Sequence, residues 1–106
     1  MNKSVFIVSE WLPKAGKEEQ LWNAFKTLME ITRKERGCIR AHATKQIKHP
    51  ASLGQSKFTM VMLQEYRDIA AFDEHIQQSY VCNFFRDYID VEDTPIADWQ
   101  CRLFEE

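Results

Sequence analysis

His75, Tyr66 and Arg40 of this 106-residue chain, which has three His, three Tyr and 14 Lys and Arg residues in all, carry functional groups suited to proton transfer or to holding a developing negative charge. An imidazole titrates near neutral pH, so His75 is a candidate general base. The phenol of Tyr66 can donate a hydrogen bond while its ring stacks on a flat molecule. The guanidinium of Arg40 can hold an oxyanion or a carboxylate. The three residues are therefore candidate catalytic groups, provided that the fold brings them together.

Each candidate also has an ordinary structural role. His75 is expected at the end of a short helix, where it can bond to the backbone and oppose the helix dipole favourably. Arg40 can pair with Glu65 across the sheet, and this ion pair is the preferred interpretation of Arg40. Tyr66 is interpreted as lining a pocket rather than as plain core. His42 is a further possible base, although a surface position or one facing a second subunit is the simpler expectation for it.

Periodicity predicts the elements in the first part of the chain. Residues 4–11 alternate between two faces, as in a strand that is covered on both sides. Apolar residues between positions 17 and 34 recur at helical spacing, with acidic residues near the start and basic residues near the end. Gly37 follows, where the end of a helix favours a residue able to adopt a positive φ.

A strand, a loop and another strand are predicted next. Residues 38–46 alternate so that Cys38 and Arg40 share one face of a strand. Residues 48–56 contain a His-Pro pair and a glycine, and they are expected to form a loop that shapes the mouth of a cleft. Residues 57–66 alternate again and are predicted to form a central strand.

The last part of the chain is predicted to return to helix and then to strand. Ile69, Phe72 and Ile76 give a short amphipathic helix, and a second helical stripe follows after a break near Ser79. A final strand is expected over residues 96–103. The order of elements predicts an α+β, ferredoxin-like fold, in which helices cover one face of a four-stranded antiparallel sheet.

Composition limits the range of functions. A chain of 106 residues is within the ordinary range for one domain, so a single domain is expected over residues 1–106. The formal net charge is −2 with both signs interspersed, and we therefore expect no nucleic-acid partner and no membrane partner. The sequence has no apolar run of membrane-spanning length and no signal-peptide layout, so a cytoplasmic location is expected.

The sequence carries no recognisable cofactor or metal motif. It has no glycine-rich phosphate loop, no nucleophile elbow and no spacing typical of metal ligands. Its cysteines, Cys38, Cys82 and Cys101, form no CxxC pair and are expected to be free thiols. We therefore predict no cofactor and no metal ion, and any chemistry must use ordinary side chains in a pocket.

Two segments together carry a family resemblance. Glu35 to Arg40 forms a turn and the start of a strand, and Leu63 to Ile76 forms a strand that leads into a short helix with His near its end. Over almost the whole chain the sequence resembles the antibiotic biosynthesis monooxygenase family of small dimeric proteins. The residues that match the family pattern are Glu35, Gly37, Cys38, Arg40, Glu65, Ala71 and His75, and Tyr66 stands where the family usually has Trp. Arg36 and Ala41 depart from the usual Pro and Tyr.

The resemblance implies a function and a pocket. Members of this family oxygenate a quinol, an anthrone or a polycyclic phenol with molecular oxygen and without a bound cofactor. Such chemistry needs a base, hydrogen-bond donors for the oxyanion, and an apolar pocket between helices and sheet. The side chains expected to line that pocket and bind the substrate are those of Trp22, Phe25, His42, Met62, Phe72 and Phe84. The strands are apolar on both faces, so a homodimer packed sheet against sheet, the dimeric α+β barrel, is also expected.

Other members of the family suggest different chemistry. The axial His of the haem-degrading members corresponds to about Phe85 here, so haem is not expected. The position of the Asn that anthrone-oxygenating members use is occupied by Met62 here, and this departure counts against anthrone-type chemistry specifically. Two alternatives to oxygenation stay open. One is an isomerase of a phosphorylated autoinducer, with a phosphate held by Arg40, Lys45 and Lys48. The other is a non-catalytic module that binds a small molecule or serves a stress response.

Overall fold

The computed structural model describes residues 3–106, which form a four-stranded antiparallel sheet and three α-helices. The elements in chain order are β1 (Val5–Pro13), α1 (Glu18–Thr32), β2 (Cys38–Lys45), β3 (Met60–Tyr66), α2 (Ile69–Ile76), α3 (Ser79–Phe84), the π-helical turn η1 (Phe85–Ile89) and β4 (Ile96–Glu105). The strand order is β2-β3-β1-β4, which places β3 in the centre as predicted. The ferredoxin-like α+β fold is thereby confirmed.

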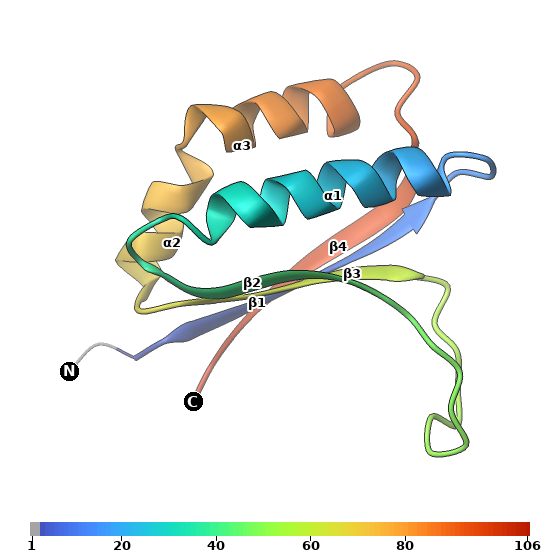
Figure 1. The fold of residues 1–106 in the computed structure, drawn as a ribbon, viewed down its shortest axis with the longest axis horizontal. Helices are drawn as coiled ribbons and strands as arrows, with labels where there is room; N and C mark the ends of the chain where they lie inside the picture. Colours follow the sequence, from blue (N-terminus) through green and yellow to red (C-terminus); the bar gives the residue numbers. More distant parts are fainter. Residues whose placement is uncertain (1–2) are drawn as a thin grey trace.

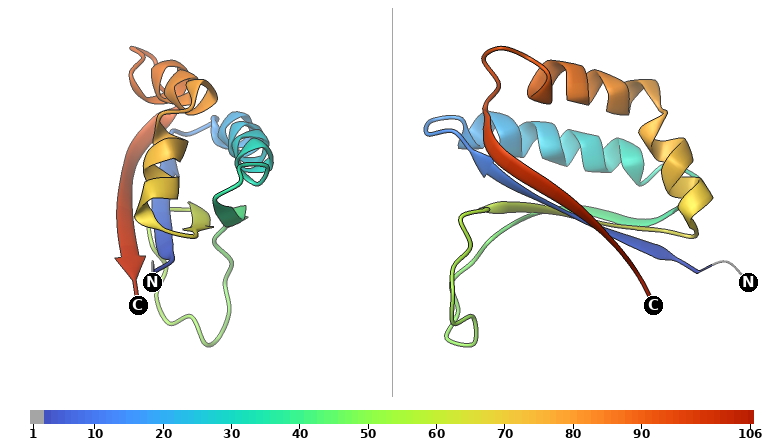
Figure 2. Two further views of the ribbon diagram at one scale, coloured as in Figure 1. Left: turned by 90° about the vertical axis from the view of Figure 1, so that its left-hand side faces the viewer. Right: turned by 180° about the vertical axis from the view of Figure 1, so that it is seen from behind.

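The helices lie together on one side of the sheet. Figure 1 shows α1 and α3 side by side, with α2 at one end of the pair. Figure 2 shows the same arrangement from the end and from behind. Alternate residues of β1 are buried against the helices, among them Val5, Ile7 and Trp11, as the alternation predicted. Removal of this apolar surface from water is the main favourable contribution to folding.

Helix α1 covers the middle of the sheet. Its buried side chains include Leu21, Phe25, Leu28 and Met29, which confirms the predicted helical stripe. Trp22 belongs to the predicted stripe but is only partly buried. It lies at the side of the helix, where the Nζ atom of Lys45 is 4.4 Å from the centre of its ring.

Strand β2 contains a β-bulge that changes which of its residues share a face. The register against β3 shifts between Cys38 and Arg40, because Ile39 stands between them as an extra residue. Cys38 pairs with Tyr66 and Arg40 pairs with Glu65, two neighbours that point to opposite faces of β3. The prediction that Cys38 and Arg40 share a face was therefore wrong, because one extra residue reverses the alternation.

Two local predictions around α2 were also wrong. Among residues 3–106 the glycine with a positive φ is Gly16, at 82°, and not Gly37. The buried residues of α2 are Ala71 and His75, whereas Ile69 and Ile76 are about half exposed. The turn at Gly37 packs directly against Ala71, and this contact determines which side of the short helix faces inward.

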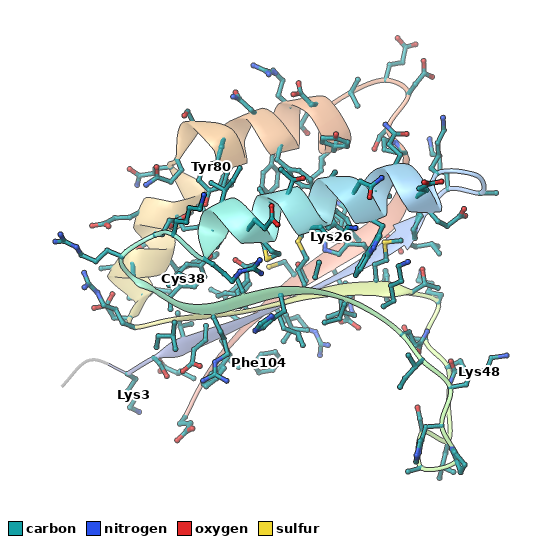
Figure 3. The ribbon with its side chains drawn as sticks, viewed as in Figure 1. Lys3, Lys26, Cys38, Lys48, Tyr80 and Phe104 are labelled. Atoms are coloured by element: carbon teal, nitrogen blue, oxygen red, sulfur yellow. The ribbon has the colours of Figure 1, made fainter. Side chains whose placement is uncertain are left out.

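The face of the sheet that is turned away from the helices carries exposed apolar side chains. Leu63 on β3 and Phe104 on β4 are 42% and 46% exposed. Figure 3 shows Phe104 on the side of the sheet opposite the helices. The connection between β2 and β3 extends from the sheet toward this same side (Figure 1). The face that the helices do not cover therefore combines exposed apolar side chains with the Arg40–Glu65 and Glu10–Arg102 ion pairs.

Candidate active site

A small cavity lies between the helices and the sheet. Its volume is about 70 Å³, and its walls come from β1, β3, β4, α1, α2, α3 and η1. The lining is mostly apolar, with the polar side chains of Ser9, Gln64 and His75 and the thiol of Cys101 among the apolar groups. Pockets for drug-sized ligands measure about 300–1,000 Å³. A ring-sized ligand therefore enters this cavity only when part of its wall moves.

His75 is held at the cavity by a carboxylate. It is 5% exposed, and its Nδ1 atom lies 2.7 Å from Oε2 of Glu35. Asp68 caps the start of α2 by accepting a hydrogen bond from the N–H of Ala71 at 2.8 Å, which fixes the helix that carries His75. Glu35 lies in the turn after α1, where its N–H donates to the carbonyl of Thr32 at 3.0 Å. The imidazole is therefore bonded to a side chain from a distant part of the sequence.

Tyr80, at the start of α3, joins the same group. Its hydroxyl donates a hydrogen bond to Oε2 of Glu35, the oxygen that also meets His75. The hydroxyl of Thr32 lies 3.1 Å from that of Tyr80 and donates to the carbonyl of Leu28 at 2.8 Å. Burial, followed by the bond to Glu35, raises the pKa of Tyr80. The phenol therefore stays protonated at neutral pH and acts as a donor.

Tyr66 lies behind the cavity rather than in its wall. It is fully buried, and its ring lies 5.2 Å from that of His75 and 5.5 Å from that of Phe72. Its hydroxyl donates to Oε1 of Gln64 at 2.5 Å, and burial raises the pKa of the phenol far above its usual range. With Oε1 engaged, the amide nitrogen of Gln64 is the part of that side chain free to donate into the cavity. A nitrogen base and an amide donor thus share an apolar cavity.

The structure brings five of the candidate residues together. Met62, Phe72, His75 and Phe84 line the cavity, and Tyr66 contacts two of them from behind. These residues come from β3, α2 and α3, and they meet because the three elements pack at one end of the sheet (Figure 2).

Arg40 lies apart from this group. The bulge in β2 directs its side chain to the face of the sheet opposite the helices, where its Nε atom is 2.9 Å from Oε1 of Glu65. The side chain of Arg40 is 64% exposed. The structure therefore contains the ion pair across the sheet, and it places Arg40 on the other side of the sheet from the imidazole of His75.

Trp22, Phe25 and His42 do not line the cavity in this conformation. Trp22 and His42 line a separate groove of about 180 Å³ between α1 and the edge of β2. Phe25 is almost completely buried and packs on Trp11, with 5.1 Å between ring centres. The position of Phe25 is that of a core residue, because its ring fills the space between α1 and the sheet.

Sequence reasoning did not assign three residues of the site, namely Glu35, Gln64 and Tyr80. Glu35 and His75 both match the family pattern, and that shared match was a signal that the two residues are connected. Gln64 is a polar residue on the apolar face of β3, which also marks it as unusual. Tyr80 gave no comparable signal, because it contacts Glu35 across a break between two helices.

Two other kinds of feature were not found among the described residues. Within residues 3–106, no group of three or more His, Cys, Asp or Glu side chains is arranged to hold a metal ion. In the same part of the chain, no helix combines the length and the apolar character that spanning a bilayer requires.

Comparison with known proteins now identifies the family. The model of the family described as antibiotic biosynthesis monooxygenase matches residues 4–87. This chain belongs to that family. The match includes the Glu35 turn, the β3 strand and the helix that carries His75, so the resemblance expected from the sequence is confirmed. No curated protein matches the sequence.

Solved structures share the fold over nearly their whole length. A Shewanella oneidensis protein is 25% identical, with a TM-score of 0.79, covering 100% of this chain and 93% of its own. A Nitrosomonas europaea protein, named as a candidate antibiotic biosynthesis monooxygenase, is 13% identical, with a TM-score of 0.79 and coverage of 100% and 92%. A dimeric Bacteroides fragilis protein with a ferredoxin-like fold is 9% identical, with a TM-score of 0.73 and coverage of 97% and 96%.

Proposed function

We propose that this protein is a cofactor-independent monooxygenase that oxidises a small electron-rich aromatic, a quinol, an anthrone or a phenol, with molecular oxygen. The observation that carries the proposal is the pairing of His75 with Glu35 at the wall of an apolar cavity. Nδ1 faces the carboxylate, so Nε2 is the nitrogen that can accept a proton from a bound ligand. Membership of the family supports the same chemistry.

The reaction needs no reductant other than the substrate. Nε2 of His75 takes a proton from the substrate, and the amide nitrogen of Gln64 donates to the oxygen on which negative charge develops. The electron-rich carbon then forms a bond to dioxygen and gives a peroxide. The peroxide takes up the proton from His75 and becomes a hydroperoxide. The same carbon then loses its remaining hydrogen as a proton, the two C–H electrons form the new C=O bond as the O–O bond breaks, and the departing hydroxide combines with the proton to form water. A phenol and O₂ thereby give a quinone and one water molecule.

Substrate access requires a wall of the cavity to move. A larger groove of about 420 Å³ runs along the outside, between α1 and the α3–η1 segment. Leu28 and Phe84 line both the groove and the inner cavity. We propose that displacement of the Phe84 side chain joins the two spaces and admits a flat ring. A single-ring phenol needs the smallest displacement, so it is the first substrate to test.

The deciding experiment is oxygen uptake by metal-free protein with a panel of quinols, anthrones and phenols. The wild type is compared with His75→Ala, with Tyr66→Phe, and with His49→Ala as the control. His49 lies in the exposed loop between β2 and β3, away from the cavity. We expect uptake that His75→Ala reduces by about 100-fold or more and Tyr66→Phe reduces less. Full turnover in both variants would show that neither His75 nor Tyr66 takes part in the reaction.

A non-catalytic binding module is the second candidate, and the small volume of the cavity favours it. A small apolar cavity can bind an aromatic without providing room for oxygen and a peroxide. Thermal stabilisation by a ligand, with no oxygen uptake across the panel, would select this function. The isomerase alternative has less support, because Arg40 lies on the open face of the sheet while the side chain of Lys45 extends to Trp22 on α1.

A second copy of the chain is the proposed macromolecular partner. The open face of the sheet carries Leu63 and Phe104, both more than 40% exposed, together with the partly buried Phe6 and Val8. Exposed apolar patches of this kind mark surfaces that associate with other molecules. Packing two such sheets together would bury both patches in a symmetric interface.

A further inference from the structure

We infer that Glu35 and Tyr80 are positioning residues, which set the tautomer of His75 and so decide which imidazole nitrogen is free to accept a proton. This inference rests on the proposed function only for its effect on turnover. Its structural content, the location of one proton, can be measured in the absence of any substrate.

The first step concerns the proton between His75 and Glu35. An ionised carboxylate is only an acceptor, so the 2.7 Å contact between Oε2 and Nδ1 requires the hydrogen on Nδ1. A neutral imidazole with hydrogen on Nδ1 has its lone pair on Nε2. His75 is 5% exposed and lines the cavity, so this lone pair is sheltered from bulk water. The contact with Glu35 thus gives His75 the tautomer that a general base needs.

The second step concerns the competing donor. The hydroxyl of Tyr80 lies 3.4 Å from Nδ1 of His75, close enough to donate to that nitrogen after a small movement. In the structure this hydroxyl donates to Glu35 instead. If Glu35 could no longer accept, the hydroxyl would turn to Nδ1, and the imidazole hydrogen would move to Nε2. Glu35 therefore holds one proton on Nδ1 and keeps a second donor away from it.

The third step concerns the support behind Tyr80. Thr32 lies 3.1 Å from the Tyr80 hydroxyl and is anchored by its own bond to the carbonyl of Leu28 at 2.8 Å. The chain of contacts joins the end of α1 to α2 and α3, as Figure 3 shows for Tyr80 between the helices. Because Oε2 of Glu35 is shared by two donors, loss of the Tyr80 hydroxyl leaves the carboxylate a stronger partner for His75.

The test is nitrogen and proton NMR of the histidine side chains in three variants. In the wild type we expect His75 to carry its hydrogen on Nδ1. In Glu35→Gln we expect the hydrogen on Nε2, because the amide nitrogen and the Tyr80 hydroxyl can both donate to Nδ1, while the neutral amide oxygen is a weaker acceptor for an Nδ1 hydrogen than the carboxylate. In Tyr80→Phe we expect the hydrogen to stay on Nδ1 and its resonance to move downfield. His49→Ala serves for signal assignment and should leave the His75 signals unchanged.

Two results would overturn the inference. The first is an Nδ1–H tautomer that persists in Glu35→Gln. The second applies even if that variant does not fold, and it is a His75 proton resonance that does not change in Tyr80→Phe. A purely structural role for these residues would change the melting temperature and leave the tautomer as it is.

Turnover separates this inference from the proposed function. If the protein oxygenates a phenol, Glu35→Gln should lower kcat by about 100-fold with a smaller effect on KM, because the base is lost and the cavity is kept. Absence of oxygen uptake by the wild type, together with the expected tautomer change, would reject the proposed function and leave the positioning role intact. Uptake that depends on His75 but not on Glu35 would reject the positioning role alone.

Discussion

A Cβ atom added to Gly37 would lie 2.4 Å from the Cβ atom of Ala71, far inside van der Waals contact. The turn after α1 and the first turn of α2 therefore meet without space for another methyl group. The same turn holds Glu35, and the same helix holds His75 one turn after Ala71. This close approach is what brings the carboxylate within hydrogen-bonding distance of the imidazole.

Substitution of Gly37 by Ala tests that contact. We expect Gly37→Ala to lower the free energy of unfolding by about 1–3 kcal/mol, because the added methyl forces the turn and the helix apart. Urea denaturation measures the change. Gly54→Ala is the matched control, since no atom lies within 4 Å of the added Cβ and the φ angle is not positive. Equal stability of the two variants would show that the turn adjusts without cost.

The large regular elements could be predicted from the sequence, because their apolar patterns extend over enough residues. The fifteen-residue helix α1 completes four turns, and the structure confirms the buried stripe that its sequence predicts. Helix α2 has eight residues, too few for the pattern to separate two faces, and there the contact with Gly37 determined which side is buried. In β2 a single extra residue reverses the alternation of the two faces. The alternation of apolar and polar residues along the strand does not reveal such a residue.

The candidate site was predicted less completely than the fold, because its contacts join distant parts of the sequence. Glu35 and His75 are 40 residues apart, and Tyr80 reaches Glu35 from a third element. The pattern of apolar residues indicates which side chains are buried but not which of two buried polar groups meet. The family pattern includes both Glu35 and His75, but matching the same pattern does not tell how far apart the two side chains lie in the fold.

Removal of the Phe84 ring tests the proposed route into the cavity. We expect Phe84→Ala to join the cavity to the outer groove and to destabilise the protein by about 3–5 kcal/mol. A single-ring phenol should then raise the melting temperature of the variant more than that of the wild type, because it fills the new space. Phe58→Ala, on the segment that leads into β3, is the control and should show no gain. An equal ligand effect in wild type and Phe84→Ala would exclude Phe84 as the barrier.

Glu10, which links β1 to β4, should make the free energy of unfolding depend on pH. The hydrogen bond from Gln100 at 2.8 Å, together with Arg102 at 2.7 Å, holds the pKa of Glu10 below its usual value of 4.5. A lowered pKa in the folded state gives stability that is complete above the unfolded value and is lost as the pH falls through the lowered pKa. At a protein concentration low enough to keep the chain monomeric, this pair stays at the surface. Under that condition we expect Glu10→Gln to cost less than about 1 kcal/mol at neutral pH, because surface pairs contribute little.

Denaturation curves at neutral pH and at about pH 3 or below would show whether this difference disappears in acid. Glu92→Gln, at an exposed position before β4, changes the net charge equally and serves as the control. A difference between wild type and Glu10→Gln that is constant across the pH range would assign the effect to packing rather than to ionisation.

A charge on the open face of the sheet tests whether a second copy covers it. Leu63 pairs with Val8 in the middle of that face and is 42% exposed, so an interface between two sheets would bury it. We expect sedimentation to show a dimer for the wild type and a dissociation constant at least about tenfold higher for Leu63→Arg, since an unpaired buried charge costs more than about 1.4 kcal/mol. Leu53→Arg adds the same charge at a loop residue that is 96% exposed, and it should leave the dimer intact. A monomeric wild type, or equal dissociation constants for the two variants, would show that this face is not where the chains meet.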